Sequence, residues 1–234
     1  IFLFTVLFIS SSVSRCQVYK YIGLENGLSN QKIYYIQKDR RGYMWFLTQE
    51  GVDRYDGKYI KHYNFSDDSI KLDSRIALNW LYMDSGNILW VIGQKGRIFR
   101  YDSQHDKFKL AYIHPELIRN KPQAFLNYGY LDKNDRIWLC YKDSITWYDI
   151  RTGTTLHMPT PVNGEITAIE QTDSNHFFIG TGNGLFHAGI EKGKLNIMPD
   201  KMVEGIGTSV HELYYHAVSK QLFVGNYKEG ILIY

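Results

Sequence analysis

Two segments of the chain contain residue types whose spacing could support metal or phosphate chemistry. Residues 211–216 read His-Glu-Leu-Tyr-Tyr-His, which is close to the zinc-binding pattern His-Glu-x-x-His. The second histidine comes one residue too late, and the segment has a strand pattern, on which the two imidazoles would not converge. Residues 180–184 read Gly-Thr-Gly-Asn-Gly, but a strand pattern follows them where a phosphate loop needs a helix. Neither segment predicts a metal or phosphate site.

The remaining ionisable residues have no spacing typical of a catalytic centre. Serine, histidine and aspartate are scattered, and no pair of carboxylates stands apart from the aspartates of predicted turns. The two cysteines, Cys16 and Cys140, provide neither a disulfide framework nor a cysteine metal site. We therefore expect no catalytic site in this chain, no metal and no cofactor. The net charge of +3 comes from interspersed Lys and Arg, so we also expect no nucleic-acid partner.

The strongest pattern is a phrase that occurs five times. Apolar residues lead into an acidic or polar turn, and an aromatic strand that ends near a glycine follows. Successive copies lie 40 to 48 residues apart, which is the length of a four-stranded propeller blade, and helical periodicity is missing. The sequence predicts an all-β fold, a β-propeller of four-stranded blades with five repeats visible. The aromatic anchors of the five repeats are Trp45, Trp90, Trp138, Phe178 and Phe223.

The first repeat defines the parts of a blade. Its four predicted strands, named A to D in chain order, span residues 32–38, 43–48, 52–55 and 59–65. In the A–B turn, Asp39 is expected to bind nearby backbone N–H groups, and Gly42 to supply a positive φ. These two residues and the five aromatic anchors are therefore predicted to be structural.

Alternate turns of such a blade lie on opposite faces of the disc. The B–C face holds the turns between strands B and C and the links between blades, and its polar and aromatic side chains would surround a central funnel. That arrangement suits a polar ligand such as a sugar, although ordinary solvated loops explain each residue equally well. The predicted ligand-binding residues are Asn30, Gln49, Glu50, Arg75, Gln94, Lys95, Tyr141, Lys142, Asn183, Tyr227 and Lys228.

The aromatic content is high, at 15% with 19 tyrosines. The tryptophan anchors recur at one place in strand B, so packing between blades explains them. Trp80, Trp147 and Tyr128 fall outside the repeat and are better candidates for stacking on a ligand.

The ends of the chain suggest a fragment of an exported protein. The apolar run of residues 1–9 is too short to span a bilayer and is typical of a signal peptide, here partial over residues 1–16, with a mature start at Gln17. A lipoprotein modified at Cys16 and a buried first strand remain alternatives. Residues 17–234 would form the blades of an incomplete sensor domain. We expect an N-terminal fragment of a larger ring, with seven blades, because a propeller must close.

The first repeat closely resembles the two-component-regulator propeller repeat. The resemblance extends over about residues 20–234; Ile92, Asp135, Phe178 and Phe223 depart from the pattern in later copies. The residues that carry it are Gly27, Leu28, Ser29, Asn30, Ile33, Ile36, Asp39, Gly42, Trp45, Thr48, Gly51, Tyr55, Asp56 and Gly57.

The resemblance implies a periplasmic sensor domain of a hybrid two-component system. Such a protein would continue with a second propeller, an immunoglobulin-like domain, a transmembrane helix, a histidine kinase core, a receiver and an AraC-type DNA-binding domain. It would detect glycan-derived oligosaccharides as a membrane-anchored homodimer and signal to the transcription of glycan-utilisation genes. The alternatives are a secreted propeller enzyme, either a streptogramin-type lyase or a glycan-active hydrolase, and a non-catalytic interaction scaffold. The enzyme would require histidines and acidic residues clustered on the B–C face.

Overall fold

The structure is a computed structural model that describes residues 19–65, 77–115, 125–162, 164–202 and 209–234. The predicted signal peptide, the mature start at Gln17 and the candidate Arg75 lie outside these residues. None of the described helices has the length and apolar character needed to cross a lipid bilayer.

The described chain folds into five antiparallel sheets, so the predicted all-β propeller is confirmed. Blade one contains β1 (Ile33–Lys38), β2 (Met44–Thr48), β3 (Gly51–Tyr55) and β4 (Ile60–Tyr63), preceded by the single-turn helix η1 (Leu24–Asn26). Blade two contains β5 (Leu78–Met83), β6 (Leu89–Gly93), η2 (Gln94–Gly96), β7 (Arg97–Asp102) and β8 (Lys107–Tyr112). Blade three contains β9 (Tyr128–Leu131), β10 (Arg136–Cys140), β11 (Ser144–Asp149) and β12 (Thr155–Pro159).

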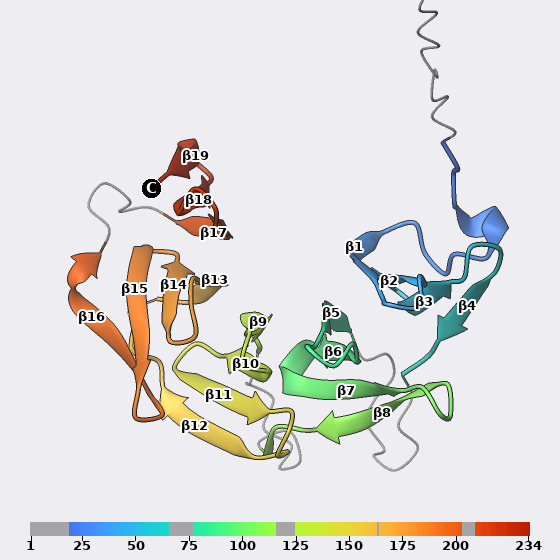
Figure 1. Cartoon of the computed structure of the whole chain (residues 1–234), viewed down its shortest axis with the longest axis horizontal. Helices are drawn as coiled ribbons and strands as arrows, with labels where there is room; N and C mark the ends of the chain where they lie inside the picture. Colours follow the sequence, from blue (N-terminus) through green and yellow to red (C-terminus); the bar gives the residue numbers. More distant parts are fainter. Residues whose placement is uncertain (1–18, 66–76, 116–124, 163, 203–208) are drawn as a thin grey trace, which may run out of the picture.

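Blade four contains β13 (Ile166–Gln171), β14 (His176–Thr181), β15 (Gly184–Glu191) and β16 (Lys194–Met202). Blade five has three strands, β17 (Val210–His216), β18 (Gln221–Asn226) and β19 (Gly230–Ile233). The blades follow one another around an open arc, with the first strand of each blade facing the centre and the fourth strands of blades one to four at the rim (Figure 1).

The A–B turn of blade one ties a buried tryptophan to the backbone. Asp39 accepts the backbone N–H groups of Arg41 and Tyr43 through Oδ1, both at 2.9 Å, and the indole N–H of Trp45 through Oδ2, also at 2.9 Å. Because the indole N–H is buried, it needs an acceptor, and the carboxylate provides one while it shapes the turn. Gly42 completes this turn with a φ of 90°.

Blades two and three repeat this arrangement. The indole of Trp90 donates to Asp84 at 2.8 Å, and that of Trp138 donates to Asp132 at 2.9 Å. The position of Gly42 is taken by Asn87, with a φ of 62°, and Asp135, with a φ of 61°. Asn and Asp tolerate this left-handed conformation better than other non-glycine residues, which explains why blade three can lack the turn glycine.

The anchors of the first four blades contact rings of the next blade. Trp45 is 1% exposed and packs against Tyr63 of its own blade and against Tyr101 and Phe108 of blade two, with ring centroids 4.8 to 6.1 Å apart. Trp138 contacts Phe177 of blade four in the same way, at 4.9 Å. The hydrophobic core is therefore divided into layers between consecutive blades, and we term each layer a seam, numbered by the blade that precedes it.

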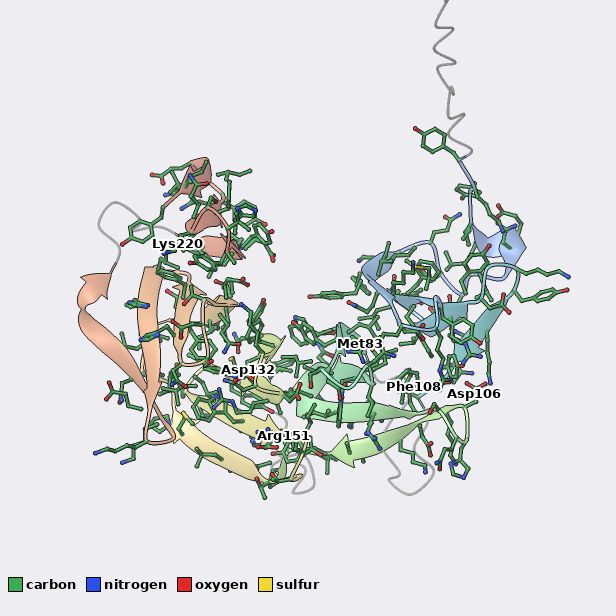
Figure 2. All side chains as sticks on the ribbon, in the orientation of Figure 1. Met83, Asp106, Phe108, Asp132, Arg151 and Lys220 are labelled. Atoms are coloured by element: carbon green, nitrogen blue, oxygen red, sulfur yellow. The ribbon has the colours of Figure 1, made fainter. Side chains whose placement is uncertain are left out.

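An ion-pair cluster reinforces the first seam at the rim. Asp106, in the turn between β7 and β8, accepts hydrogen bonds from Arg54 Nη1 at 2.8 Å, Tyr63 Oη at 2.6 Å and Tyr101 Oη at 2.5 Å, and it pairs with Lys61 (Figure 2). Burial raises the pKa of Asp106, but these donors outweigh burial and hold the pKa well below its usual range. The cluster joins blade one to blade two.

Replacing Trp45 by Ala should lower the free energy of unfolding by about 3 to 5 kcal/mol, because the change empties the first seam and leaves the Asp39 carboxylate without the indole N–H. Gln49→Ala, in an exposed B–C turn, is the control and should leave stability nearly unchanged. Denaturant midpoints of the complete exported region measure both variants. Equal losses would contradict the assignment of Trp45 to the core.

Asp106→Asn should destabilise the protein by about 1 kcal/mol at neutral pH, since the carboxylate is partly exposed. Because the folded-state pKa is lowered, the contribution of Asp106 is present above its unfolded pKa of about 3.9 and is lost as the pH falls through the folded value. The difference in melting temperature between wild type and variant should therefore shrink below about pH 4. A constant difference from pH 3 to pH 7 would rule out this coupling, and Asp143→Asn, in the exposed turn after β10, is the matched control.

Candidate ligand site

The B–C turns are held by a capping interaction that three blades share. In each, a side-chain oxygen at the end of strand B accepts the backbone N–H of the turn residue two positions later. The three pairs are Thr48 with Glu50 at 3.2 Å, Thr181 with Asn183 at 3.0 Å, and Asn226 with Lys228 at 2.8 Å. Glu50, Asn183 and Lys228 thus occupy equivalent, exposed positions.

The other predicted ligand residues lie in the same turns but differ in exposure. Gln49, Lys142 and Tyr227 are exposed, and the Tyr227 ring contacts His211 with centroids 3.9 Å apart. Gln94 and Lys95 are half-buried in η2.

Two of the predicted ligand residues make contacts within the protein. Asn30 accepts the backbone N–H of Lys32 at 2.8 Å and so shapes the entry to β1. Tyr141 is only 6% exposed and packs against His114 at 4.9 Å, so its side chain offers little surface to a ligand. The described candidates therefore come from all five blades, and of the contacts given above for them only that of Tyr141 with His114, which follows β8 of blade two, lies between blades.

The expectation that Trp80 and Trp147 stack on a ligand is wrong. Trp80 is 7% exposed and lies against Gly129 and Tyr128 of blade three, where a Cβ at position 129 would be only 3.0 Å from the indole. Trp147 is 4% exposed and packs on Trp138 at 4.9 Å. Both residues belong to the seams between blades.

The first strands place a wall of tyrosines and glutamates toward the centre of the arc, which the repeat pattern did not reveal. The Tyr82 hydroxyl of blade two donates to the Gly129 carbonyl of blade three at 2.7 Å. Burial, with a smaller contribution from Glu212 of blade five, raises the pKa of Tyr35 in blade one to about 12. The Glu212 carboxylate of the fifth described blade thus lies near enough to raise the pKa of the Tyr35 hydroxyl in blade one.

Glu170, on β13, belongs to the same wall. Its Oε1 accepts the backbone N–H of Tyr215 in blade five at 3.3 Å. Burial raises its pKa, and Glu212 adds to the rise, while the hydrogen bond from Tyr215 and the charge of Lys133 oppose it. The ionised form of Glu170 is therefore destabilised by its place in the central wall.

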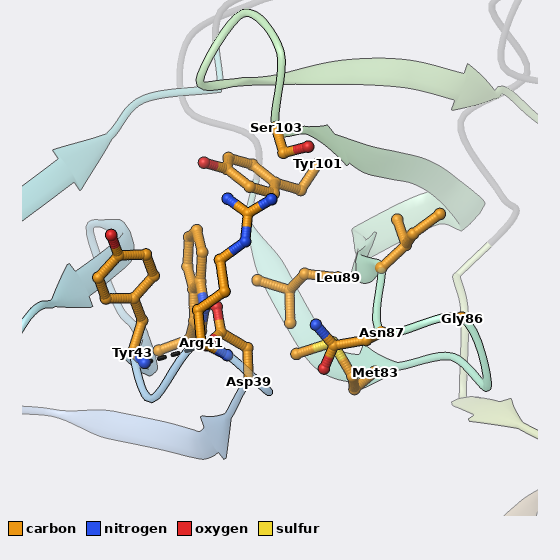
Figure 3. Close-up of a pocket in the computed structure, with 11 residues that line it drawn as sticks. Asp39, Arg41, Tyr43, Met83, Gly86, Asn87, Leu89, Tyr101 and Ser103 are labelled. Carbon is orange, nitrogen blue, oxygen red and sulfur yellow. Dashed lines mark hydrogen bonds between the residues drawn. The ribbon is translucent and has the colours of Figure 1, made fainter.

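Three grooves lie away from the predicted B–C face residues. The first-seam groove has a volume of about 190 Å³ and lies between blades one and two; Arg41 extends into it toward Tyr101 and Ser103 (Figure 3). The fourth-seam groove, of about 390 Å³, lies between blades four and five and is lined by residues that include Phe178, His187 and Lys220. A rim groove of about 700 Å³ lies between β12 and the turn that joins β15 to β16.

The first-seam and fourth-seam grooves open on the A–B face, which is formed by the turns at residues 39–43, 84–88, 132–136, 172–176 and 217–220 and lies opposite the B–C face. Within the residues that the structure describes, no group of three or more His, Cys, Asp and Glu side chains is arranged to hold a metal ion.

Replacing Glu170 by Gln keeps the acceptor for Tyr215 and removes the buried charge. Because the folded-state pKa of Glu170 is raised, the wild type should lose stability as the pH rises from about 4.3 through the folded value, and the variant should not. The variant should therefore melt at a higher temperature at pH 8 and at the same temperature near pH 4. Melting curves across this range test the prediction, and Glu50→Gln, on an exposed turn, is the control.

Comparisons with known proteins agree with this architecture. Residues 27–50, at the start of blade one, match the family model described as two component regulator propeller. The extracellular domain of the hybrid two component system BT3049 from B. thetaiotaomicron superposes with a TM-score of 0.70 and 21% identity, over 92% of this chain and 30% of that one. No curated protein matches the sequence.

Two further solved structures share the fold. Virginiamycin B lyase from Staphylococcus aureus superposes with a TM-score of 0.60 at 14% identity, covering 86% of this chain and 69% of that one. PorZ, a surface component of the type-IX secretion system of Porphyromonas gingivalis, gives 0.59 at 13% identity, covering 86% and 32%. At these identities the likeness concerns the fold alone.

This chain spans less than a third of the BT3049 domain, so the comparison describes a part of such a domain. The resemblance predicted from the sequence is confirmed in the first repeat: residues 27–50 match the two-component-regulator propeller model, and the described residues form five blades of a β-propeller whose fold resembles that of the extracellular BT3049 domain.

Proposed function

We propose that this chain is part of the extracytoplasmic ligand-sensing region of a hybrid two-component system sensor histidine kinase. The observation that carries the proposal is the family match at residues 27–50, in the blade whose Asp39 and Trp45 contacts are repeated in blades two and three. The likeness to the extracellular BT3049 domain supports a location outside the cytoplasm, which in this protein would be the periplasm.

The signal in this proposal is a glycan-derived oligosaccharide, and the response is transcription of glycan-utilisation genes. The periplasmic region would work as a homodimer, and the full protein would be anchored in the inner membrane. A ligand can change kinase activity only if it binds one arrangement of the dimer more tightly than another. The proposed ligand must therefore contact surfaces that differ between the two arrangements.

The ring in this proposal is completed by further blades. Apolar side chains are exposed at both ends of the arc: Tyr34 and Ile36 on β1 are 44% and 58% exposed, and Ile231 and Ile233 on β19 are 73% and 60% exposed. Exposed apolar patches of this kind are normally covered in a stable protein. Additional blades that bring the ring to seven would cover these side chains, and seven lies within the 4 to 8 blades with which propellers close.

The B–C turns are the proposed ligand contacts of this ring. Glu50, Asn183 and Lys228 support the assignment because their backbones are fixed by equivalent caps, while their side chains are exposed. A turn whose backbone is already fixed loses less conformational freedom when its side chains bind a ligand. The other described candidates on this face are Asn30, Gln49, Gln94, Lys95, Tyr141, Lys142 and Tyr227.

The test is calorimetric titration of the complete exported region with plant, microbial and host oligosaccharides. We expect saturable binding of one chemical class, and the same class should change autophosphorylation of the full-length protein in membranes. Glu50→Ala should weaken binding severalfold, while the matched variant Glu191→Ala, at the exposed end of β15 toward the opposite face, should not. Turnover of an oligosaccharide would instead support the propeller enzyme, and a folded region that binds none of the panel would overturn the sensor proposal.

A further inference from the structure

The first-seam and fourth-seam grooves occupy the same place in the repeat. The A–B turns have equal length, since the backbone N–H of Asp39 bonds to Tyr43 and that of Thr172 bonds to His176, both at 3.0 Å. Arg41 and Ser174 are therefore equivalent positions. Trp45 is paired with Arg54 as Phe178 is paired with His187, so His187 is the equivalent of Arg54. By the same register, Tyr101 of blade two corresponds to Tyr234 of blade five. The two grooves can therefore be compared residue by residue.

The first-seam groove is largely filled by the protein itself. Arg41 reaches across it from the A–B turn toward Tyr101 (Figure 3). Arg54 is held by Asp106 at 2.8 Å and Tyr101 at 2.7 Å, and its guanidinium lies 4.8 Å from the centre of the Tyr43 ring. The groove retains only about 190 Å³.

In the fourth-seam groove, the positions of Arg41 and Arg54 are held by other residues. Ser174 is short and exposed, and His187 stands where Arg54 stands in the first seam. The His187 ring stacks on Phe178, with centroids 5.1 Å apart and planes inclined by 24°. The volume rises to about 390 Å³, which falls in the range of pockets that bind small molecules.

The walls of the fourth-seam groove combine aromatic surface with polar groups of both charges. Phe178, Tyr215 and Tyr234 supply the aromatic surface. On one side, His176 Nδ1 bonds to the Asp173 carboxylate at 2.9 Å, and on the other Lys220 extends from the A–B turn of blade five (Figure 2).

This composition selects the chemical class of the ligand. A rim that carries a carboxylate, an ammonium group and imidazoles favours a neutral ligand with many hydrogen-bonding groups over a strongly charged one. A stacked aromatic floor favours a ligand with a flat apolar face. A sugar ring has both properties, because its hydroxyls lie at the edge and its C–H groups form the faces.

We propose that the fourth-seam groove is a subsite for one sugar unit of a neutral oligosaccharide, on the face opposite the B–C turns. The choice of an oligosaccharide as the source of that unit rests on the proposed sensor function. The sugar face lies on Phe178 and His187, and Asp173, His176 and Lys220 bond to its hydroxyls. Because Lys220, Tyr215 and Tyr234 come from blade five and the other lining residues from blade four, the sugar bridges two blades.

The test uses Ser174→Arg, which introduces at the fourth seam the side chain that fills the first. Ser174 is exposed, and its only role in a described hydrogen bond is through its carbonyl, which accepts the Asn134 amide at 2.7 Å, so the variant should keep the fold. The reciprocal variant Arg41→Ser is the matched control. The complete exported region and both variants are titrated with short oligosaccharides of glucose, mannose, galactose, xylose and arabinose, and circular dichroism and melting curves verify folding.

We expect Ser174→Arg to weaken binding of the recognised oligosaccharide about tenfold or more, and Arg41→Ser to leave it unchanged. Lys220→Asn, which suits the positive φ of 55° at that position, should give a smaller, severalfold loss. If folded Ser174→Arg binds with wild-type affinity while the wild-type region binds a member of the panel, the groove proposal is overturned and the sensor proposal stands. If the wild-type region binds none of these neutral sugars, the groove proposal is overturned, and the sensor proposal is overturned only if the region also binds none of the plant, microbial and host oligosaccharides.

Discussion

The hydrogen bond from the tryptophan indole to the aspartate of the A–B turn is the interaction on which the first three blades depend. One carboxylate satisfies the turn backbone and the buried indole together, so it fixes the turn and the ring orientation at once. The oriented ring is also the surface on which the next blade packs, as Trp45 does on Tyr101 and Phe108. Local turn chemistry thereby determines the contact between blades.

Blade four shows what changes when this hydrogen bond is absent. Phe178 has no N–H to donate, and the turn position of the aspartate is taken by Thr172, whose hydroxyl bonds to the His176 carbonyl at 3.2 Å. Phenylalanine at the anchor and threonine in the turn belong together, because an aspartate without the indole donor would keep a charge beside an apolar ring. The smaller aromatic ring and the short Ser174 leave space at the fourth seam, whereas Trp45 and Arg41 occupy it at the first.

The sequence was sufficient to predict the blades, because anchor spacing and turn chemistry are local properties. It could not predict which aromatic residues are accessible. Trp147 lies outside the repeat in sequence, but on β11 it is paired directly with Trp138, and alternation along the strand directs it into the same seam. The central wall was missed for a related reason: Tyr35 and Glu212 are nearly 180 residues apart, and only the curvature of the arc brings the Glu212 carboxylate near enough to raise the pKa of Tyr35. The correspondence of Arg41 with Ser174 likewise needed the observed turn geometry.

A site at a seam has a mechanical consequence that a site within one blade lacks. Strand hydrogen bonds hold each blade as a rigid sheet, whereas the fourth seam is maintained by side-chain packing of residues such as Leu185 and Val210 and by side-chain hydrogen bonds such as that of Glu170 with Tyr215. Packed interfaces can slide by small amounts, while a ladder of backbone hydrogen bonds cannot do so without breaking. A sugar that contacts both blades would bind most tightly to one spacing of the seam and would therefore favour that spacing in the population. Ligand recognition in the groove between blades four and five would in this way bias the geometry of the arc, which is the requirement that any sensor built on this fold must meet.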